Sequence, residues 1–392
     1  MRLPLLLLLL PPLSSPLSLP PLPKLPSPPA FVSPPAFIAA SLLSLSLLAP
    51  PSLAAGTVAP LADVGLGEFL VKDSKQLLRL SLPYTPGDPG RAAQESLEYV
   101  KLRLDQVGFA GKKSVWSSAL KDLSAAKASL SSSRPALLEA VPGARRGAAE
   151  RELALLDEAL AQLGDALRDQ DISATTAAQA GAAERLYEVR LAAQPRARLP
   201  YELPGEVAML PTLRGRATVS ATVTRGDARA KPFEMGESER GQTYSATLPL
   251  SIVVDGLRAP VTAGNFVDLV ARGAYAGAEV GGTSDLFVNV KAKKPSARRI
   301  PLELFYKKDG GPTYHYNSDE DKRATEAFMD PFQAPGAMGM VHEPEDSDSA
   351  SDEFFFLKWK QNADKLDQIR KGDVISAVKV VDGMENFVPG GK

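Results

Sequence analysis

The side chains that most often perform acid–base, nucleophilic or metal chemistry are scarce in this chain. It holds two histidines, His315 and His342, and no cysteine. The lack of cysteine excludes a thiol nucleophile, a disulfide framework and a thiolate metal site. Two isolated histidines offer little to a metal centre, and no phosphate-loop, dinucleotide or Gly-x-Ser-x-Gly pattern occurs. We therefore predict no metal and no cofactor.

Charged residues gather in two stretches. Residues 290–299 (VKAKKPSARR) are basic, which would suit an acidic partner but is more typical of a solvated loop. Residues 343–353 (EPEDSDSASDE) hold six acids without the spacing of a calcium loop, so a mobile acidic loop is favoured. The totals, 45 basic against 46 acidic residues, leave no positive excess for nucleic-acid phosphates. We predict no nucleic-acid partner.

Residues 1–55 have the composition of a targeting leader. Fourteen of the 34 prolines fall in this stretch and the first acidic residue is Asp63, so a stable core element is not expected here. The apolar run at 36–49 is short for a membrane span and suits a signal, with small residues at Ala54 and Ala55 for cleavage. Two signals in series predict import into an organelle and then export across an internal membrane. The alternative is a disordered or mispredicted N-terminus.

Residues 62–193 are predicted to form a helical bundle. Apolar residues recur there at steps of three and four, most clearly from Leu153 to Leu167. We expect breaks at 131–135, 142–143 and 169–174, which divide the region into roughly four antiparallel helices. The leucine run could also form a coiled coil between chains, but two heptads favour packing within the bundle.

A proline-rich linker at 194–216 precedes a domain at 217–388 in which the apolar period changes from 3.6 to 2. Alternating residues predict strands around 217–223, 248–254, 286–290 and 374–381. Residues 263–273 are predicted to form a helix with Thr262 as its N-cap. The fold class is α+β and multidomain, with a helical bundle followed by an antiparallel barrel or sandwich. No membrane span is expected in the mature chain.

Several stretches of the second domain resemble the cyclophilin family of peptidyl-prolyl isomerases, over about residues 215–385. Residues 250–277 (LSIVVDGLRAPVTAGNFVDLVARGAYAG) are similar to the opening of that barrel. Residues 332–343, 351–357 and 371–383 resemble three of its later strands. A helical domain and a YELP linker before the barrel look like the large thylakoid-lumen cyclophilins of plants and algae. This resemblance implies a location in the chloroplast, in the thylakoid lumen, which agrees with the two signals in series. The matching positions of the opening stretch are Pro260, Thr262, Asn265, Phe266, Tyr275 and Gly277.

The resemblance implies a proline-binding pocket without any covalent or metal chemistry. Position by position, the pocket residues carried over are Phe287, Val288, Val341, His342 and Phe355. The family's catalytic arginine falls on Gly282, and nothing in the sequence indicates that Lys291 or Lys293 replaces it. We therefore assign no catalytic residue. Glu353 and Val290 stand where the family has glutamine.

A second departure follows Phe355. The sequence runs directly into the closing helix and strand, so one barrel strand and part of the pocket are absent and the barrel is predicted to be incomplete. The resemblance implies an isomerase that binds proline-containing segments and assists folding or assembly of lumenal proteins, including photosystem subunits, with weak turnover. The alternative is a non-catalytic chaperone, or a scaffold that binds its partner through the helical domain.

Overall fold

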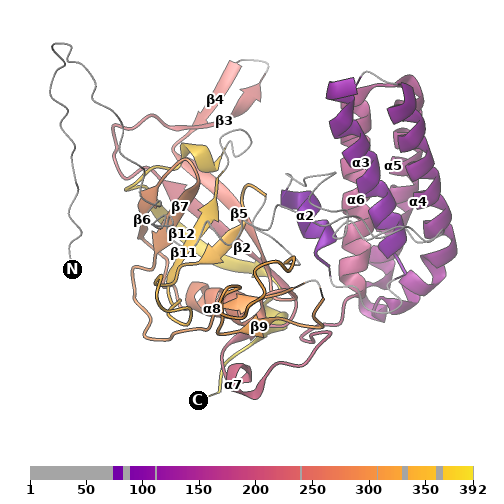
Figure 1. Ribbon diagram of the computed structural model, residues 1–392. Helices are drawn as coiled ribbons and strands as arrows, with labels where there is room; N and C mark the ends of the chain where they lie inside the picture. The colour runs from indigo at the N-terminus through magenta and orange to yellow at the C-terminus, as the bar shows by residue number, and fades with distance from the viewer. Residues whose placement is uncertain are drawn as a thin grey trace, which may run out of the picture.

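Helices make up the first part of the structure and strands the second (Figure 1). The computed structural model describes residues 74–82, 89–110, 113–238, 241–306, 308–328, 334–358 and 365–391. The order of elements confirms the predicted α+β class, with a helical region before an antiparallel sheet. The predicted leader at 1–55 lies outside the described residues.

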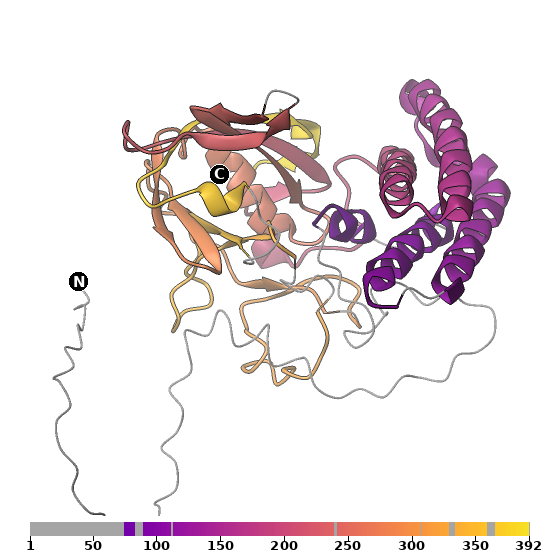
Figure 2. The ribbon, with the colours of Figure 1, turned by 90° about the horizontal axis from the view of Figure 1, so that it is seen from above.

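Four long helices pack side by side, and a short helix lies between them and the strands (Figures 1 and 2). The leucine stripe on the third long helix is almost fully buried inside this bundle, so it packs within the chain rather than against a second one. The helices are α2 (Ser74–Leu80), α3 (Arg91–Ala110), α4 (Lys113–Ala140), α5 (Gly143–Asp169) and α6 (Ile172–Ala193).

The predicted break at 131–135 is wrong, because α4 continues through Pro135. A proline inside a helix removes one hydrogen bond and costs about 3 kcal/mol. Leu130 and Leu137, on either side of the proline, are both buried in the bundle. Their packing offsets the cost of the proline, an effect that a local reading of the sequence does not include. The breaks near 142 and 170 are confirmed.

Seven antiparallel strands form one strongly curled sheet that wraps around helix α8 (Pro260–Ala271) (Figures 1 and 2). The alternation of valine and alanine along the sequence turns one face of each strand inward, and these side chains build a single apolar core with Phe266 and Tyr275. The strand order is β10 (Met338–Met340), β11 (Glu353–Leu357), β7 (Phe287–Lys291), β6 (Ala278–Thr283), β12 (Val374–Asp382), β2 (Arg216–Thr224) and β5 (Thr247–Asp255).

Shorter elements surround this sheet. Three two-stranded pairs are formed by β1 (Thr212–Leu213) with β13 (Phe387–Val388), β3 (Phe233–Ser238) with β4 (Gly241–Ser245), and β8 (Glu303–Leu304) with β9 (Thr313–Tyr314). Single turns occur at α7 (Gly205–Ala208), η2 (Leu366–Gln368) and η3 (Met384–Asn386).

The N-terminus of α8 is capped by a residue that is distant in sequence. Thr262 lies inside the helix and is not its N-cap, which corrects the prediction. The Glu303 carboxylate accepts hydrogen bonds from the amides of Val261 (3.2 Å) and Thr262 (2.9 Å), and from the Tyr314 hydroxyl (2.8 Å). This carboxylate satisfies two of the amide groups that every helix leaves free at its start.

The half-buried carboxyl of Glu303 predicts a pH dependence of stability. Burial raises the pKa of this carboxyl above 4.5, and its hydrogen bonds only partly oppose the shift. The folded state therefore holds the proton more tightly than the unfolded state. The contribution of Glu303 to the free energy of unfolding is greatest below pH 4.5 and falls as the pH rises through the raised pKa.

Urea unfolding of the wild type and of Glu303→Gln at a series of pH values measures this effect. The difference in the free energy of unfolding, wild type minus variant, should shrink as the pH rises from 4.5, because glutamine does not titrate. A difference that grows with pH would contradict the raised pKa.

A buried arginine, paired with an aspartate inside the sheet, joins the sheet to the helical region through hydrogen bonds. Arg216, at the start of β2, donates to Asp255 Oδ2 (2.7 Å), to the Tyr187 hydroxyl of α6 (2.7 Å) and to Ser81 Oγ (2.8 Å). Arg258 donates to the Ser81 carbonyl at 2.7 Å. Burial alone would lower the pKa of Arg216, but the Asp255 charge and the hydrogen bonds raise it by more. The net pKa is above the usual value, so the guanidinium stays charged. The two regions are thus held together by charged groups with little access to water.

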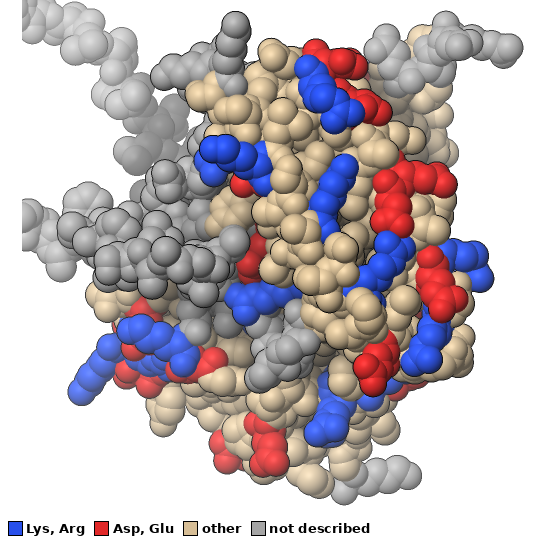
Figure 3. Space-filling view, turned by 90° about the vertical axis from the view of Figure 1, so that its right-hand side faces the viewer, with Lys and Arg blue, Asp and Glu red and all other residues tan. Residues whose placement is uncertain are grey.

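The outer face of the helical region carries basic and acidic side chains next to one another (Figure 3). Two ion pairs there are Arg134 with Asp157 at 2.9 Å and Arg185 with Glu152 at 2.8 Å. On the described residues of this face, charges of both signs are thus interspersed rather than gathered into a patch of one sign. No helix in the described part of the chain combines the length and apolar composition needed to cross a membrane.

Candidate functional site

The candidate proline-binding surface is the outer face of three neighbouring strands, β7, β11 and β10. Phe355 of β11 lies directly opposite Asn289 of β7 on one side and Gly339 of β10 on the other. Residues directly opposite in antiparallel strands share a face. Phe287, opposite Leu357, therefore lies on the same outer face as Phe355. Both phenylalanine rings remain partly exposed on a curved sheet.

Four of the five predicted pocket residues lie on or beside this face. Phe287 and Phe355 stand on adjacent strands, offset by two positions. The Val341 amide donates to the Glu353 carbonyl at 2.8 Å, so Val341 continues the pairing just after β10. His342 follows it and is half-buried, with Nδ1 2.8 Å from the Glu343 carbonyl oxygen.

Val288 does not join the other four. It is 1% exposed and belongs to the apolar core, on the opposite face of β7 from Phe287. The alternation of side chains along a strand is the physical reason, because a one-residue change of register moves a side chain to the other face. Asn289 lies on the outer face, where the comparison with the family had placed Val288 and Val290.

Asn289 is a site residue that the sequence prediction missed. Its Nδ2 donates to Glu353 Oε1 at 2.6 Å, while its buried Oδ1 has no hydrogen-bond partner within the described structure. The alternation of Val288 and Val290 was the available signal, since it predicts that Asn289 points outward with Phe287.

Gly282, which stands at the family's arginine position, is next to Asn289. A Cβ atom on Gly282 would lie 2.6 Å from Asn289 Oδ1. A side chain at position 282 would therefore begin against an amide oxygen, and glycine itself supplies no donor there. That oxygen accepts hydrogen bonds and cannot donate one to a substrate.

Two lysines lie close to these strands. Lys291 lies on the outer face, opposite Glu353 and exposed to solvent. Lys358 is buried, and its ammonium lies 3.2 Å from Thr283 Oγ1 and 3.7 Å from Asp367 Oδ1. A solvated or carboxylate-paired ammonium exerts a weaker field than an arginine held in a dry site. The surface can hold an apolar ring, but its cations are poorly placed to polarise the substrate.

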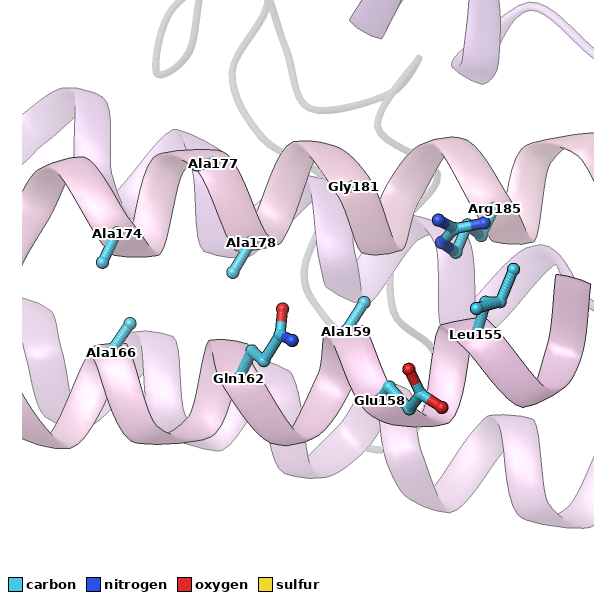
Figure 4. A pocket seen from close by; sticks show the side chains of 10 residues that line it. All are labelled: Leu155, Glu158, Ala159, Gln162, Ala166, Ala174, Ala177, Ala178, Gly181 and Arg185. Carbon is cyan, nitrogen blue, oxygen red and sulfur yellow. The ribbon is translucent and has the colours of Figure 1, made fainter.

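A larger hollow of about 400 Å³ lies between α5 and α6, away from this surface (Figure 4). Small side chains line most of it, and its few polar groups include Glu158, Gln162 and Arg185. Arg185 is already paired with Glu152. Ligand sites are usually lined by apolar and aromatic side chains with a few polar groups, and no aromatic side chain lines this hollow. It does not compete with the strand surface as the candidate site.

Both regions of the chain match known protein families. Residues 243–392 match the family described as cyclophilin type peptidyl-prolyl cis-trans isomerase/CLD. Residues 73–189 match the PsbQ-like domain of CYP38-like peptidyl-prolyl cis-trans isomerases. The resemblance stated from the sequence is therefore confirmed in both regions.

Three curated relatives extend the comparison. A putative thylakoid lumen peptidyl-prolyl cis-trans isomerase of Synechocystis is 27% identical over 354 residues, covering 82% of this chain and 85% of the relative. The chloroplastic isomerases CYP38 and CYP37 of Arabidopsis thaliana are 30% and 29% identical, each over 48% of this chain. The aligned parts span 47% and 44% of those two proteins. These locations agree with the one expected for this chain.

Proposed function

Residues 243–392 belong to the cyclophilin-type peptidyl-prolyl isomerase family, and we propose that the protein binds proline-containing segments on the outer face of β7, β10 and β11 and isomerises them slowly. The observation that carries this proposal is the pairing of Phe355 with Asn289 beside Gly282. It combines an apolar surface for a proline ring with an empty arginine position.

Isomerisation requires little of the enzyme except binding and electrostatics. Rotation about the X–Pro bond has a barrier of about 18–20 kcal/mol because the amide is conjugated. In the transition state conjugation is lost and the prolyl nitrogen gains a lone pair. A catalyst lowers the barrier by holding the ring and placing a donor at that nitrogen. Phe355 and Phe287 supply the apolar contact, and the bound segment rotates against them.

Weak turnover follows from the donor groups that the face offers. Gly282 has no side chain, and Asn289 Nδ2 is already engaged by Glu353. Lys291 is exposed, so water screens its charge. Loss of one preorganised donor in other enzymes slows the chemical step about 10²- to 10³-fold. The protein should therefore bind proline segments but isomerise them slowly.

We further propose that the protein assists the folding or assembly of lumenal proteins, including photosystem subunits. Support comes from the lumenal and chloroplastic relatives and from the PsbQ-like domain. A non-catalytic chaperone or assembly scaffold is the second candidate, and the empty arginine position at Gly282 favours it. In that case the helical domain, held to the barrel by the hydrogen bonds of Arg216 to Tyr187 and Ser81, presents a further surface to the partner.

Replacing Phe355 with alanine should weaken the binding of a short Ala-Pro peptide about tenfold or more. Burial of one aromatic ring contributes about 1.5–3 kcal/mol, and 1.4 kcal/mol corresponds to a factor of ten in Kd. Titration of the peptide into labelled protein, followed by NMR, measures the change. Tyr244→Ala is the matched control, because Tyr244 is 51% exposed on the separate β3–β4 hairpin. Equal affinities of Phe355→Ala and wild type would contradict the assigned surface.

A further inference from the structure

The curled sheet has an open seam between its first and last strands. β10 and β5 are the two edges of the seven-stranded order, and no strand of the described structure pairs with the outer side of either. The seam is the structural consequence of the strand that the sequence lacks after Phe355. Each edge presents backbone amide and carbonyl groups that a further strand would satisfy.

The inward side chains at the seam are only partly covered. Leu248 and Val254, near the ends of β5, are buried at 0% and 4% exposed. Leu250 and Ile252, between them on the same face, are only half-buried. A small apolar cavity of about 10 Å³ connects these two residues with Phe356 of β11 across the interior. The core therefore lacks apolar cover in the middle of the seam.

The two edges also lack the charges that normally prevent strand addition. No charged residue occurs from 247 to 254 or from 336 to 341. Exposed edges are commonly protected by lysine or by a covering element. Pro249 is the sole residue on β5 of a type that limits pairing. An occupant of this seam must bring an extended backbone and uncharged side chains at its inward positions.

The position of α2 favours a single extended segment over a second folded copy. Ser74, the first residue of α2, lies 3.9 Å from where a Cβ on Gly336 would stand, just before β10. At the other end of the same helix, Ser81 Oγ donates to Asp255 at the end of β5 (3.0 Å). The segment around α2 thus lies next to the ends of both edge strands, which leaves less room there for a second folded domain than for a single extended segment.

We propose that the seam binds the extended part of a client segment, next to its proline, as an added β-strand. The inference rests on the proposed proline-binding function. β10 connects the two sites, because Gly339 lies opposite Phe355 and Val341 follows at the pocket. A segment paired with the edge of β10 therefore has its next residues within reach of Phe355. The client class is an extended segment with alternating uncharged apolar residues beside an X–Pro bond.

Hydrogen–deuterium exchange with two synthetic peptides tests this inference. Both peptides contain Ala-Pro, and one carries alternating Thr and Val before it, whereas the other carries Lys in place of Val. The Val peptide should bind at least tenfold more tightly and slow amide exchange in β5 and β10. The Lys peptide should do neither. In the variant Ile252→Lys the advantage of the Val peptide should disappear.

Val253→Lys is the matched control, since Val253 is on the same strand but points outward and is 39% exposed. It should bind both peptides as the wild type does. A short Ala-Pro peptide separates the two proposals: if it binds wild type and Ile252→Lys equally, the pocket works without the seam. If it binds neither protein, the proposed function fails.

Three results would overturn the seam proposal. Both long peptides could bind equally without changing exchange in β5 and β10. Exchange in these strands could already be slow without peptide, which would mean that the seam is filled from within the chain. Sedimentation could show a dimer, and amide exchange in β5 and β10 could become faster when the dimer is diluted. This would make a second copy of the chain the occupant of the seam.

Discussion

Replacing Gly282 with arginine is expected to raise catalysed exchange at an Ala-Pro bond about ten- to a hundredfold. The guanidinium would stand on the outer face beside Asn289, within reach of a prolyl nitrogen held against Phe355. A single preorganised donor contributes about 10²–10³ in rate in comparable sites, and incomplete placement lowers this figure. The Asn289 side chain must rotate, because its Oδ1 would lie 2.6 Å from the new Cβ. That oxygen has no partner to lose and can accept from the guanidinium.

Gly282→Leu is the control for bulk, and it should leave the exchange rate at the wild-type level. The double variant Gly282→Arg with Glu353→Gln should exceed the single variant, because Glu353 otherwise attracts the new guanidinium away from the substrate. Exchange measured by NMR on the peptide gives all three rates. If Gly282→Arg folds, binds the peptide and remains as slow as the wild type, the missing arginine is not the cause of weak turnover.

Replacing Asp255 with alanine should lower the free energy of unfolding by about 3–5 kcal/mol, the usual cost of leaving a buried charge unpaired. The loss of Asp255 lowers the pKa of Arg216, but the guanidinium would keep its charge because arginine is not deprotonated in proteins. Urea unfolding followed by tryptophan fluorescence and by circular dichroism measures the change. The helical region and the barrel should also separate more easily, which limited proteolysis would show as cleavage near residues 194–216.

Tyr187→Phe provides the matched comparison in the same network. It removes one hydrogen bond to Arg216, whose donor–acceptor distance is 2.7 Å, without changing the charge balance. We expect a loss of about 1–2 kcal/mol from that variant. Equal effects of Asp255→Ala and Tyr187→Phe would contradict the view that the charge of Asp255, which holds Arg216 in place, matters more to this network than one hydrogen bond to the helical region.

Periodicity in the sequence predicted the larger features of the fold well. The leucine stripe of α5 and the alternating strands β2, β5, β7 and β12 were all visible as patterns, because burial of one face imposes them. Long-range contacts were not visible in this way. The cap that Glu303 gives to α8 and the pairing of Arg216 with Asp255 depend on residues about 40 positions apart. Nothing in the local sequence identifies such partners.

At the candidate site, the family alignment and the alternation of apolar residues gave different predictions. The carry-over from the family placed Val288 in the pocket, whereas the alternation of Val288 and Val290 predicts that both point to the core. The structure follows the alternation and brings Asn289 to the outer face. A family alignment cannot detect a one-residue shift when the strand before it has also changed, as it has at Gly281 and Gly282. Burial of Val288 and Val290 is therefore a better guide to the register of this strand than the family alignment.

The central claim is that this protein binds proline segments but isomerises them weakly. Two-dimensional exchange NMR of an Ala-Pro peptide with the wild-type protein tests it most directly, because one experiment reports both binding and the rate of cis-trans exchange. We predict shifts of the peptide resonances at the proline, with an exchange rate only slightly above that of the free peptide. Exchange as fast as that produced by a cyclophilin with its arginine in place would contradict the account.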